Sequence, residues 1–287
     1  MDSLETTPIS LDVRIEFSRA AFEVIARRIG VRVLHVKGTT LDGSLRSRRR
    51  SGTDVDTMVD PLALPAMHAA LVQHGWAVYS SFVEGSPFGH AQTYHHPEWG
   101  YIDMHRRFPG IVLPDQDAFE VLWAGHDTHV SAGIECAIPS VDAQAVLFVL
   151  NAARDLDVLG DEARALWSGQ DEQARIRRSR LVRMLHAEVA FGAGLGDLER
   201  YRGRREYLLW KTVSQGGGRL AEWWGRIRAA PTFGDALRTA AQAPRVNRSV
   251  LAHELGREPD SRDVFLAFLR RVGSALRSIR PGNGART

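Results

Sequence analysis

Apolar and polar positions along the first 75 residues alternate with two different periods. Residues 11–29 repeat apolar side chains about every 3.6 positions and end at Gly30, which predicts a helix. The short β-branched run VRVLHVK (31–37) predicts a strand that leads into Gly38. The segment TDVDTMVD (53–60) alternates with period two and predicts another strand. Asp60-Pro61 then caps and opens a helix that closes at Gly75.

Three further strands are predicted before residue 109, at residues 76–84, 89–96 and 101–108. The last two flank the turn at residues 97–100 (PEWG), so they form a predicted hairpin.

The pattern changes at Ser140, which is the expected N-cap of a helix beginning VDAQAVLFVLNAARD. Helical stretches follow, with predicted loops at the glycine-rich segments 192–196 and 216–218. We therefore expect an α+β fold in which a mixed sheet with flanking helices (residues 1–139) precedes an all-helical lobe (residues 140–287).

Composition fits a folded globular chain, because 44% of the residues are hydrophobic and 25% are charged. The sequence has no apolar run of 18 residues and its N-terminal segment has no signal-peptide pattern, so we expect no membrane partner and a cytoplasmic location. The single cysteine, Cys136, cannot form an internal disulfide and is expected to be buried.

The formal net charge is +3, and arginine supplies nearly all of the positive charge because lysine occurs only at Lys37 and Lys211. Basic residues cluster at 46–50 (RSRRR) and 175–180 (RIRRSR). Such runs are usually solvated faces of loops or helices, so a nucleic-acid partner is open but not favoured.

Asp54 and Asp56 are the first candidates for chemistry. Successive side chains on a strand alternate between its faces, so these two carboxylates project to the same side. Paired carboxylates are hard oxygen ligands that suit Mg²⁺. A pair of acidic residues that faces water on an edge strand is the alternative.

Other polar residues favour the metal site over that alternative. Asp103 and His105 share a face of the strand at 101–108, and a central antiparallel sheet would bring Asp103 beside the first pair. Lys37, Gly38 and Thr39 follow the first strand, where a helix N-terminus would favour phosphate. Arg50 supplies a forked cation. His90, His95 and His96 are interpreted as a strand face near the site and not as a zinc site.

Taken together, the segments VKGTTL (36–41), Arg50, DVDTMV (54–59) and IDMH (102–105) resemble the uncharacterised nucleotidyltransferases of the DNA polymerase β-like superfamily. The resemblance covers about residues 20–155. The superfamily more usually has Gly-Ser where this chain has Lys37-Gly38.

The resemblance implies a catalytic domain at residues 1–139, followed by a helical domain, and transfer of a nucleoside monophosphate from an NTP, with ATP favoured, to an acceptor hydroxyl. It implies that Asp54, Asp56 and Asp103 hold two Mg²⁺ ions, with Mn²⁺ as a substitute. Lys37, Gly38, Thr39, Arg50 and His105 would form the nucleotide site, with His105 either a partner of Asp103 or purely structural.

The acceptor is not encoded in a recognisable motif, so a small molecule, a peptide and a protein all stay open. Two other functions also stay open: a nucleotide-binding or adaptor protein that retains the fold, and an RNA-directed nucleotidyltransferase suggested by the basic clusters and tryptophans. The helical half is expected to supply most of the acceptor site.

Overall fold

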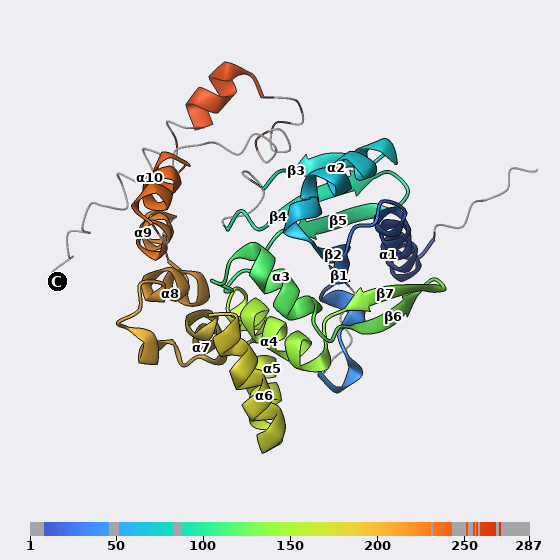
Figure 1. Cartoon of the computed structure of the whole chain (residues 1–287). Coiled ribbons are helices and arrows are strands. Elements are labelled where there is room, and N and C mark those ends of the chain that lie inside the picture. Colours follow the sequence, from blue (N-terminus) through green and yellow to red (C-terminus); the bar gives the residue numbers. More distant parts are fainter. Residues whose placement is uncertain are drawn as a thin grey trace, which may run out of the picture. The chain divides into compact units, whose positions relative to one another are not determined.

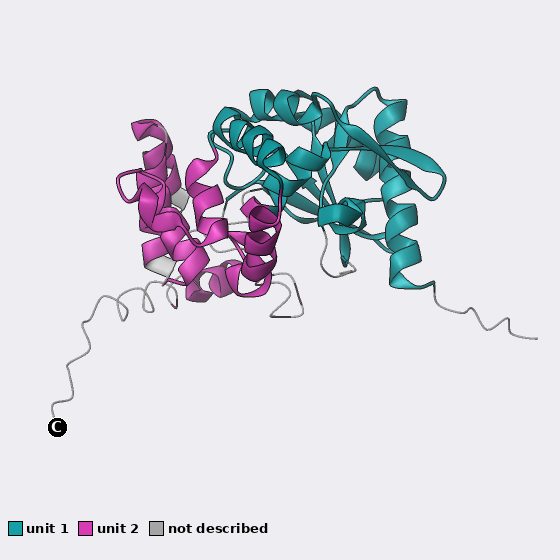
Figure 2. Cartoon of the chain, turned by 90° about the horizontal axis from the view of Figure 1, so that it is seen from below, with its two compact units in different colours: residues 1–148, 171–186 teal, residues 149–170, 187–287 magenta. Residues whose placement is uncertain are grey.

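The computed structural model describes residues 9–45, 52–82, 88–217, 219–230 and 232–242, together with residues 251, 255, 257, 259–267 and 270. Arg50 and the basic cluster at 46–50 lie outside this part of the chain. Two compact units are distinguished in Figure 2: residues 1–148 with 171–186, and residues 149–170 with 187–287. The domain boundary expected between residues 139 and 140 stays a prediction.

A five-stranded mixed sheet is the centre of the first unit (Figure 1). Its strands are β1 (Val33–His35), β2 (Asp54–Val59), β3 (Ala77–Ser80), β4 (Ala91–His96) and β5 (Gly100–His105), in the order β1-β2-β5-β4-β3. The predicted strands are confirmed, although β1 and β3 are shorter than expected, and β4 and β5 form the predicted hairpin.

The pairing of β2 with β5 is parallel, which corrects the antiparallel arrangement expected for the strands that carry the aspartates. Helix α2 (Leu64–Gln73) carries the chain from the end of β2 across to β3, and β3, β4 and β5 then follow one another antiparallel. The chain reverses its direction between β3 and β4 and again between β4 and β5, so β5 runs in the same direction as β2.

Helices α1 (Leu11–Arg28) and α2 supply the helical side of the core. Phe22 of α1 and Met67 of α2 belong to the same buried cluster as Val55, Tyr94 and Ile102 of the sheet. The predicted cap of the second helix is also confirmed, because the side chain of Asp60 accepts a hydrogen bond from the backbone of Leu62 in the turn η3 (Pro61–Ala63). Alternation along β2 then places the side chains of Asp54 and Asp56 on the opposite face from Val55.

A second, two-stranded sheet was not predicted from the sequence. It consists of β6 (Asp127–Ser131) and β7 (Ile134–Ile138), and it follows helix α3 (Asp115–Trp123), which was also missed. The turn between these strands contains Ala132 and Gly133, both with positive φ (45° and 81°). Alternation across residues 127–138 around a glycine turn is the signal that would have identified this hairpin.

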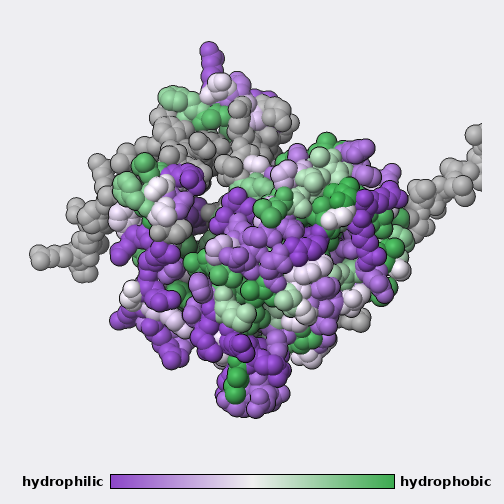
Figure 3. Space-filling view, in the orientation of Figure 1, coloured by the Kyte–Doolittle hydropathy of each residue, from purple (hydrophilic) through white to green (hydrophobic). Residues whose placement is uncertain are grey.

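Two further helices begin in or belong to the first unit. The predicted N-cap of α4 (Val141–Ala152) is confirmed, because the Ser140 hydroxyl accepts a hydrogen bond from the backbone of Ala143 at 3.4 Å. Arg177 and Arg178 of α6 (Glu172–Met184) both form ion pairs with Asp142, at 2.6 Å and 2.9 Å. The face of α6 visible at the bottom of Figure 3 is mainly hydrophilic.

Within its described residues the second unit is helical, as expected. It contains the end of α4 followed by α5 (Leu156–Ser168), α7 (Glu188–Leu195), η4 (Leu198–Tyr201), α8 (Tyr207–Gln215), α9 (Arg219–Ala229) and α10 (Phe233–Gln242). Trp210 is buried, whereas Trp224 is 56% exposed. Gly216, at a φ of 75°, ends α8, which confirms the turn expected there.

The loop expected at residues 192–196 is wrong, because most of this segment is the last turn of α7. Two glycines of this segment allow neighbouring elements to pack closely against α7. A Cβ on Gly194 would lie 2.1 Å from the carbonyl oxygen of Val149, and a Cβ on Gly192 would lie 2.5 Å from the ring of Tyr201. Only Gly196 adopts the left-handed conformation that ends the helix (φ 78°). None of the described helices is long and apolar enough to cross a membrane.

Candidate active site

Three aspartates gather on the face of the sheet opposite the α1–α2 core. In the parallel ladder Asp56 lies opposite Asp103, and Asp54 lies opposite Tyr101. Ligand atoms of Asp56, Asp103 and His105 all lie within 4.8 Å of one another. The parallel pairing therefore brings together two segments that are almost fifty residues apart in the sequence, with the acidic side chains in adjacent positions.

Lys37 and His105 both bind the same oxygen of Asp56. Lys37 Nζ donates to Asp56 Oδ1 at 2.7 Å, and His105 Nε2 lies 2.8 Å from that oxygen. The backbone of Lys37 has a φ of 64°, which is unusual for a residue with a Cβ and costs conformational energy. The Thr40 hydroxyl, which donates to the carbonyl oxygen of Lys37 at 2.7 Å, helps to hold this conformation.

The three carboxylates do not have equal charge compensation. Burial alone would raise the pKa of Asp56, but Lys37 and the hydrogen bond with His105 outweigh it and hold this pKa well below its usual range. Burial, together with the charges of Asp56 and Asp103, raises the pKa of Asp54 to about 6. Without a further cation, the negative charge of the three aspartates is therefore not balanced by the positive charge of Lys37.

This excess charge and the donor set fit a bound divalent cation. Carboxylate oxygens are the ligands that Mg²⁺ prefers, and two carboxylates close together require positive charge between them. His105 is buried, and burial followed by the charge of Lys37 lowers its pKa, so its imidazole is neutral at pH 7. Its function in the structure is to donate a hydrogen bond to Asp56.

Two residues of the predicted nucleotide site, Gly38 and Thr39, lie in the turn that follows Lys37. The predicted helix after Lys37 is only a single 3-10 turn, η1 (Gly38–Thr40), so it offers no helix dipole for phosphate. Thr39 Oγ1 donates a hydrogen bond to Glu16 Oε1 of α1 at 2.9 Å. Gly38 has a φ of 59° and open space where a Cβ would be.

The three histidines expected on one strand face do not share one. His95 and His96 are successive residues of β4 and therefore point to opposite faces. His96 packs near Trp76, with ring centroids 5.2 Å apart, whereas His90 is buried beside His105 at 5.1 Å.

Thr93 was not identified from the sequence. It lies opposite Asp103 in the β4–β5 ladder, and its hydroxyl donates to Asp103 Oδ1 at 2.6 Å. This hydrogen bond fixes the orientation of the carboxylate. Alternation along β4 predicts that Thr93 and His95 share a face, but only the pairing with β5 shows that this face carries Asp103.

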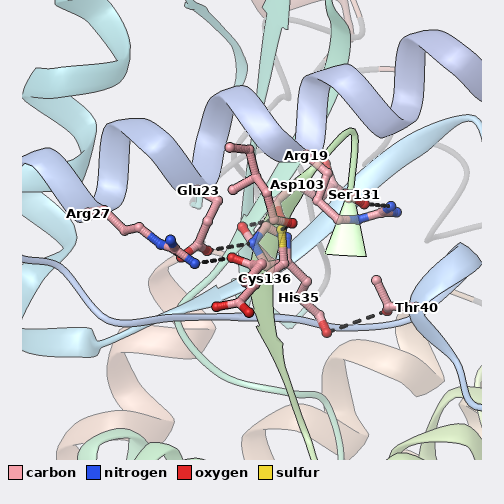
Figure 4. Close-up of polar contacts among 11 residues, drawn as sticks. Arg19, Glu23, Arg27, His35, Thr40, Asp103, Ser131 and Cys136 are labelled. Atoms are coloured by element: carbon pink, nitrogen blue, oxygen red, sulfur yellow. Dashed lines mark hydrogen bonds and ion pairs between the residues drawn. The ribbon is translucent and has the colours of Figure 1, made fainter. Parts of the chain in front are cut away.

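A second polar cluster, also missed, lies between α1, β1 and β7 and consists of Glu23, His35 and Cys136 (Figure 4). Glu23 Oε2 lies 3.0 Å from His35 Nε2, and Arg27 binds the other carboxylate oxygen at 2.8 Å. Burial raises the pKa of the Cys136 thiol to about 12, so the thiol is protonated at pH 7.

Comparison with known proteins gives limited similarity. No family model matches the chain, and no curated protein matches its sequence. One similar solved structure is the lincosamide antibiotic adenylyltransferase LnuA bound to lincomycin, with 19% identity and a TM-score of 0.33, covering 45% of this chain and 82% of that one. Another is the antibiotic-resistance factor ANT(2'')-Ia, with 13% identity and a TM-score of 0.40, covering 67% of this chain and 95% of that one.

Proposed function

We propose that the protein transfers a nucleoside monophosphate from an NTP, with ATP the favoured donor, to the hydroxyl group of an acceptor. The observation that carries this proposal is the placement of Asp54, Asp56 and Asp103 on one sheet face, with Lys37 bonded to the central carboxylate. A structural role alone gives no reason to place a poorly compensated third carboxylate, Asp54, beside two others.

In the proposed reaction the acceptor oxygen forms a bond to the α-phosphorus of the NTP. The bond from that phosphorus to the β-phosphate oxygen breaks, and pyrophosphate leaves. The hydroxyl proton passes to Asp103, whose carboxylate is oriented by Thr93 at 2.6 Å. Lys37, which is held close to Asp56, neutralises charge on the phosphates, and Arg50 is proposed to assist it.

Asp54, Asp56 and Asp103 are the residues that would hold Mg²⁺ or its substitute Mn²⁺, and bound metal would polarise the phosphate and activate the acceptor hydroxyl. Lys37 and His105 are not proposed as metal ligands. Both contact the Asp56 carboxylate and favour its ionised form. Asp56 is therefore available as a charged ligand across the physiological pH range.

Matched labels on ATP test this reaction. The protein is incubated with Mg²⁺, a lysate of its source and ATP labelled either at the α-phosphate or at the γ-phosphate. Nucleotidyl transfer moves the α-label into an acceptor and releases the γ-label as pyrophosphate. Label in the acceptor from γ-labelled ATP alone would indicate a kinase and would contradict the proposal.

The other functions suggested by the sequence give different results in the same assay. Binding of ATP without release of pyrophosphate would favour the nucleotide-binding or adaptor function. Labelling confined to RNA would favour an RNA-directed enzyme. Arg177 and Arg178 give that alternative little support, because both side chains are engaged by Asp142.

A further inference from the structure

A group of aromatic side chains that includes two exposed tyrosines lies on the same sheet as the aspartates. Tyr79, His95 and Tyr101, here named the aromatic shelf, come from β3, β4 and β5. The ring centroid of Tyr101 lies 4.6 Å from that of His95 and 5.2 Å from that of Tyr79. Tyr101 is 39% exposed and Tyr79 is 46% exposed, so the shelf is not part of the core. Clustered aromatic rings left open to water are typical of a binding surface.

The strand registers place the shelf directly beside the carboxylates. Tyr101 and Asp103 are two residues apart on β5 and therefore share a face. Tyr101 also lies opposite Asp54 in the ladder with β2, and opposite His95 in the ladder with β4. The shelf thus continues the face of the active site toward the β3 edge of the sheet.

The position of Lys37 indicates which reactant reaches the shelf. Lys37 follows β1, on one side of β2, whereas the shelf lies on the other side, across β5, β4 and β3. Because the attacking and leaving oxygens are in line at the phosphorus, the acceptor approaches from the side opposite the pyrophosphate. With the leaving phosphates near Lys37, the shelf and Asp103 lie on the side of the acceptor.

Charge restricts the acceptor further. In the proposed complex the shelf borders Asp54, Asp103 and the phosphates of the NTP, so an anionic acceptor would meet repulsion there. Stacking on Tyr101 requires a flat ring, and the faces of aromatic rings also attract cations. We propose that the acceptor is a neutral or cationic hydroxyl compound with a planar ring that stacks on the aromatic shelf and presents its hydroxyl to Asp103.

This inference rests on the proposed nucleotidyl transfer, and the test separates the two. The probes are 2-phenylethanol, 2-cyclohexylethanol and 4-(2-hydroxyethyl)benzoate, each incubated with the full chain, Mg²⁺ and α-labelled ATP. The first two differ in the planarity of the ring, and the third adds a negative charge. Pyrophosphate released in the absence of alcohol measures transfer to water, which does not use the shelf.

The variants are Tyr101→Leu, which keeps apolar volume without a ring, and Tyr101→Phe, which keeps the ring. Phe233→Leu is the matched control, because Phe233 is an exposed aromatic residue (85%) on α10, far from the shelf in the sequence. Ring stacking should favour 2-phenylethanol over 2-cyclohexylethanol in kcat/KM by about 2- to 12-fold. Tyr101→Leu should abolish this preference, Tyr101→Phe and Phe233→Leu should retain it, and the benzoate should be the poorest acceptor.

Each other result overturns the inference. Release of pyrophosphate without any ring preference, or without labelling of these alcohols, would reject the shelf as the acceptor site while leaving nucleotidyl transfer intact. An increase in the KM for ATP in Tyr101→Leu, with the ring preference unchanged, would assign the shelf to the nucleobase. If ATP were bound but no pyrophosphate were released under any condition, the proposed function would fail and the inference with it.

Discussion

Two clusters of acidic and histidine side chains lie on opposite faces of the five-stranded sheet, and they differ in exposure and charge balance. Asp56 and Asp103 are half-buried and lie next to Asp54, and the buried His105 is hydrogen-bonded to Asp56. Glu23, His35 and Cys136 are buried beside α1, and there the single carboxylate is paired with both His35 and Arg27. One cluster has excess negative charge, whereas in the other each charge has a partner.

This comparison shows why residue type alone does not identify a metal site. In both clusters potential ligand atoms lie within 4.8 Å of one another. In the Glu23 cluster, however, each oxygen of the single carboxylate already binds a donor and the thiol stays protonated, so a cation would have to displace an existing ion pair. Both donors to Asp56, in contrast, bind its Oδ1. We therefore assign chemistry to the aspartates and stability to the Glu23 cluster, and the following predictions test that division.

The largest expected effect is on transfer in Asp54→Asn and Asp56→Asn. Loss of a metal-holding charge removes several kcal/mol of transition-state stabilisation, which corresponds to a decrease in rate of about a thousandfold or more. Pyrophosphate release measures the rate, and circular dichroism checks the fold. Asp127→Asn, at an exposed position on β6, is the matched control and should have normal activity. Near-normal turnover in either active-site variant would remove that residue from the mechanism.

Asp103→Asn should separate binding from chemistry. Lys37 and the two aspartates of β2 remain to hold the nucleotide, so the Kd for ATP with Mg²⁺, measured by calorimetry, should stay within about threefold of the wild-type value. The rate should fall by about 10²- to 10⁴-fold, because the proton acceptor is lost. If affinity fell as far as in Asp56→Asn, Asp103 would have to be reassigned to nucleotide binding.

Glu23→Gln should affect stability and not activity. The amide cannot replace the charged partner of Arg27, and it weakens the hydrogen bond with His35. We expect the free energy of unfolding to fall by about 1–3 kcal/mol, as measured by urea titration. Glu98→Gln, at an exposed turn position, should change it by less than about 0.5 kcal/mol. If Mg²⁺ raises the Tm of the wild type, the rise should persist in Glu23→Gln and disappear in Asp56→Asn. The reverse result would assign metal binding to the Glu23 cluster and a structural role to the aspartates.

The smallest effect is a dependence of stability on pH. Burial lowers the pKa of His35 below its ordinary value, despite the opposing effect of Glu23. The unfolded chain therefore takes up a proton near pH 6.5 that the folded chain does not, and stability falls as the pH decreases below that value. Burial by itself would raise the pKa of Glu23, but His35 and Arg27 together lower it, so this carboxylate adds loss of stability below about pH 4.5.

For His35 the slope cannot exceed about 1.4 kcal/mol per pH unit, the value for one proton. Urea titrations between pH 7.5 and 5.5 should give a shallower dependence for His35→Gln than for the wild type. His126→Gln serves as the control, because His126 is exposed on the turn after α3. Equal slopes for wild type and His35→Gln would show that His35 takes up its proton in the folded state as readily as in the unfolded state.

Features that depend on a few neighbouring residues could be predicted from the amino-acid sequence. Period-two alternation was enough to place Asp54 and Asp56 on one face and Val55 on the other, and Asp60-Pro61 was enough to mark the start of a helix. The predicted α+β class followed from the same patterns. Glycine-rich segments predicted loops less reliably. Gly194, for example, lies in a helix, and a side chain there would collide with the backbone of Val149.

Contacts between distant segments, in contrast, could not be predicted from local sequence patterns. Parallel pairing of β2 with β5 aligned Asp103 with Asp56, whereas the sequence had favoured an antiparallel sheet. The positive φ of Lys37, the Glu23–His35 pair and the aromatic shelf likewise depend on contacts between separate elements. A residue's own neighbours fix the face on which its side chain lies, but the free energy of packing across the whole sheet selects the strand that lies beside it.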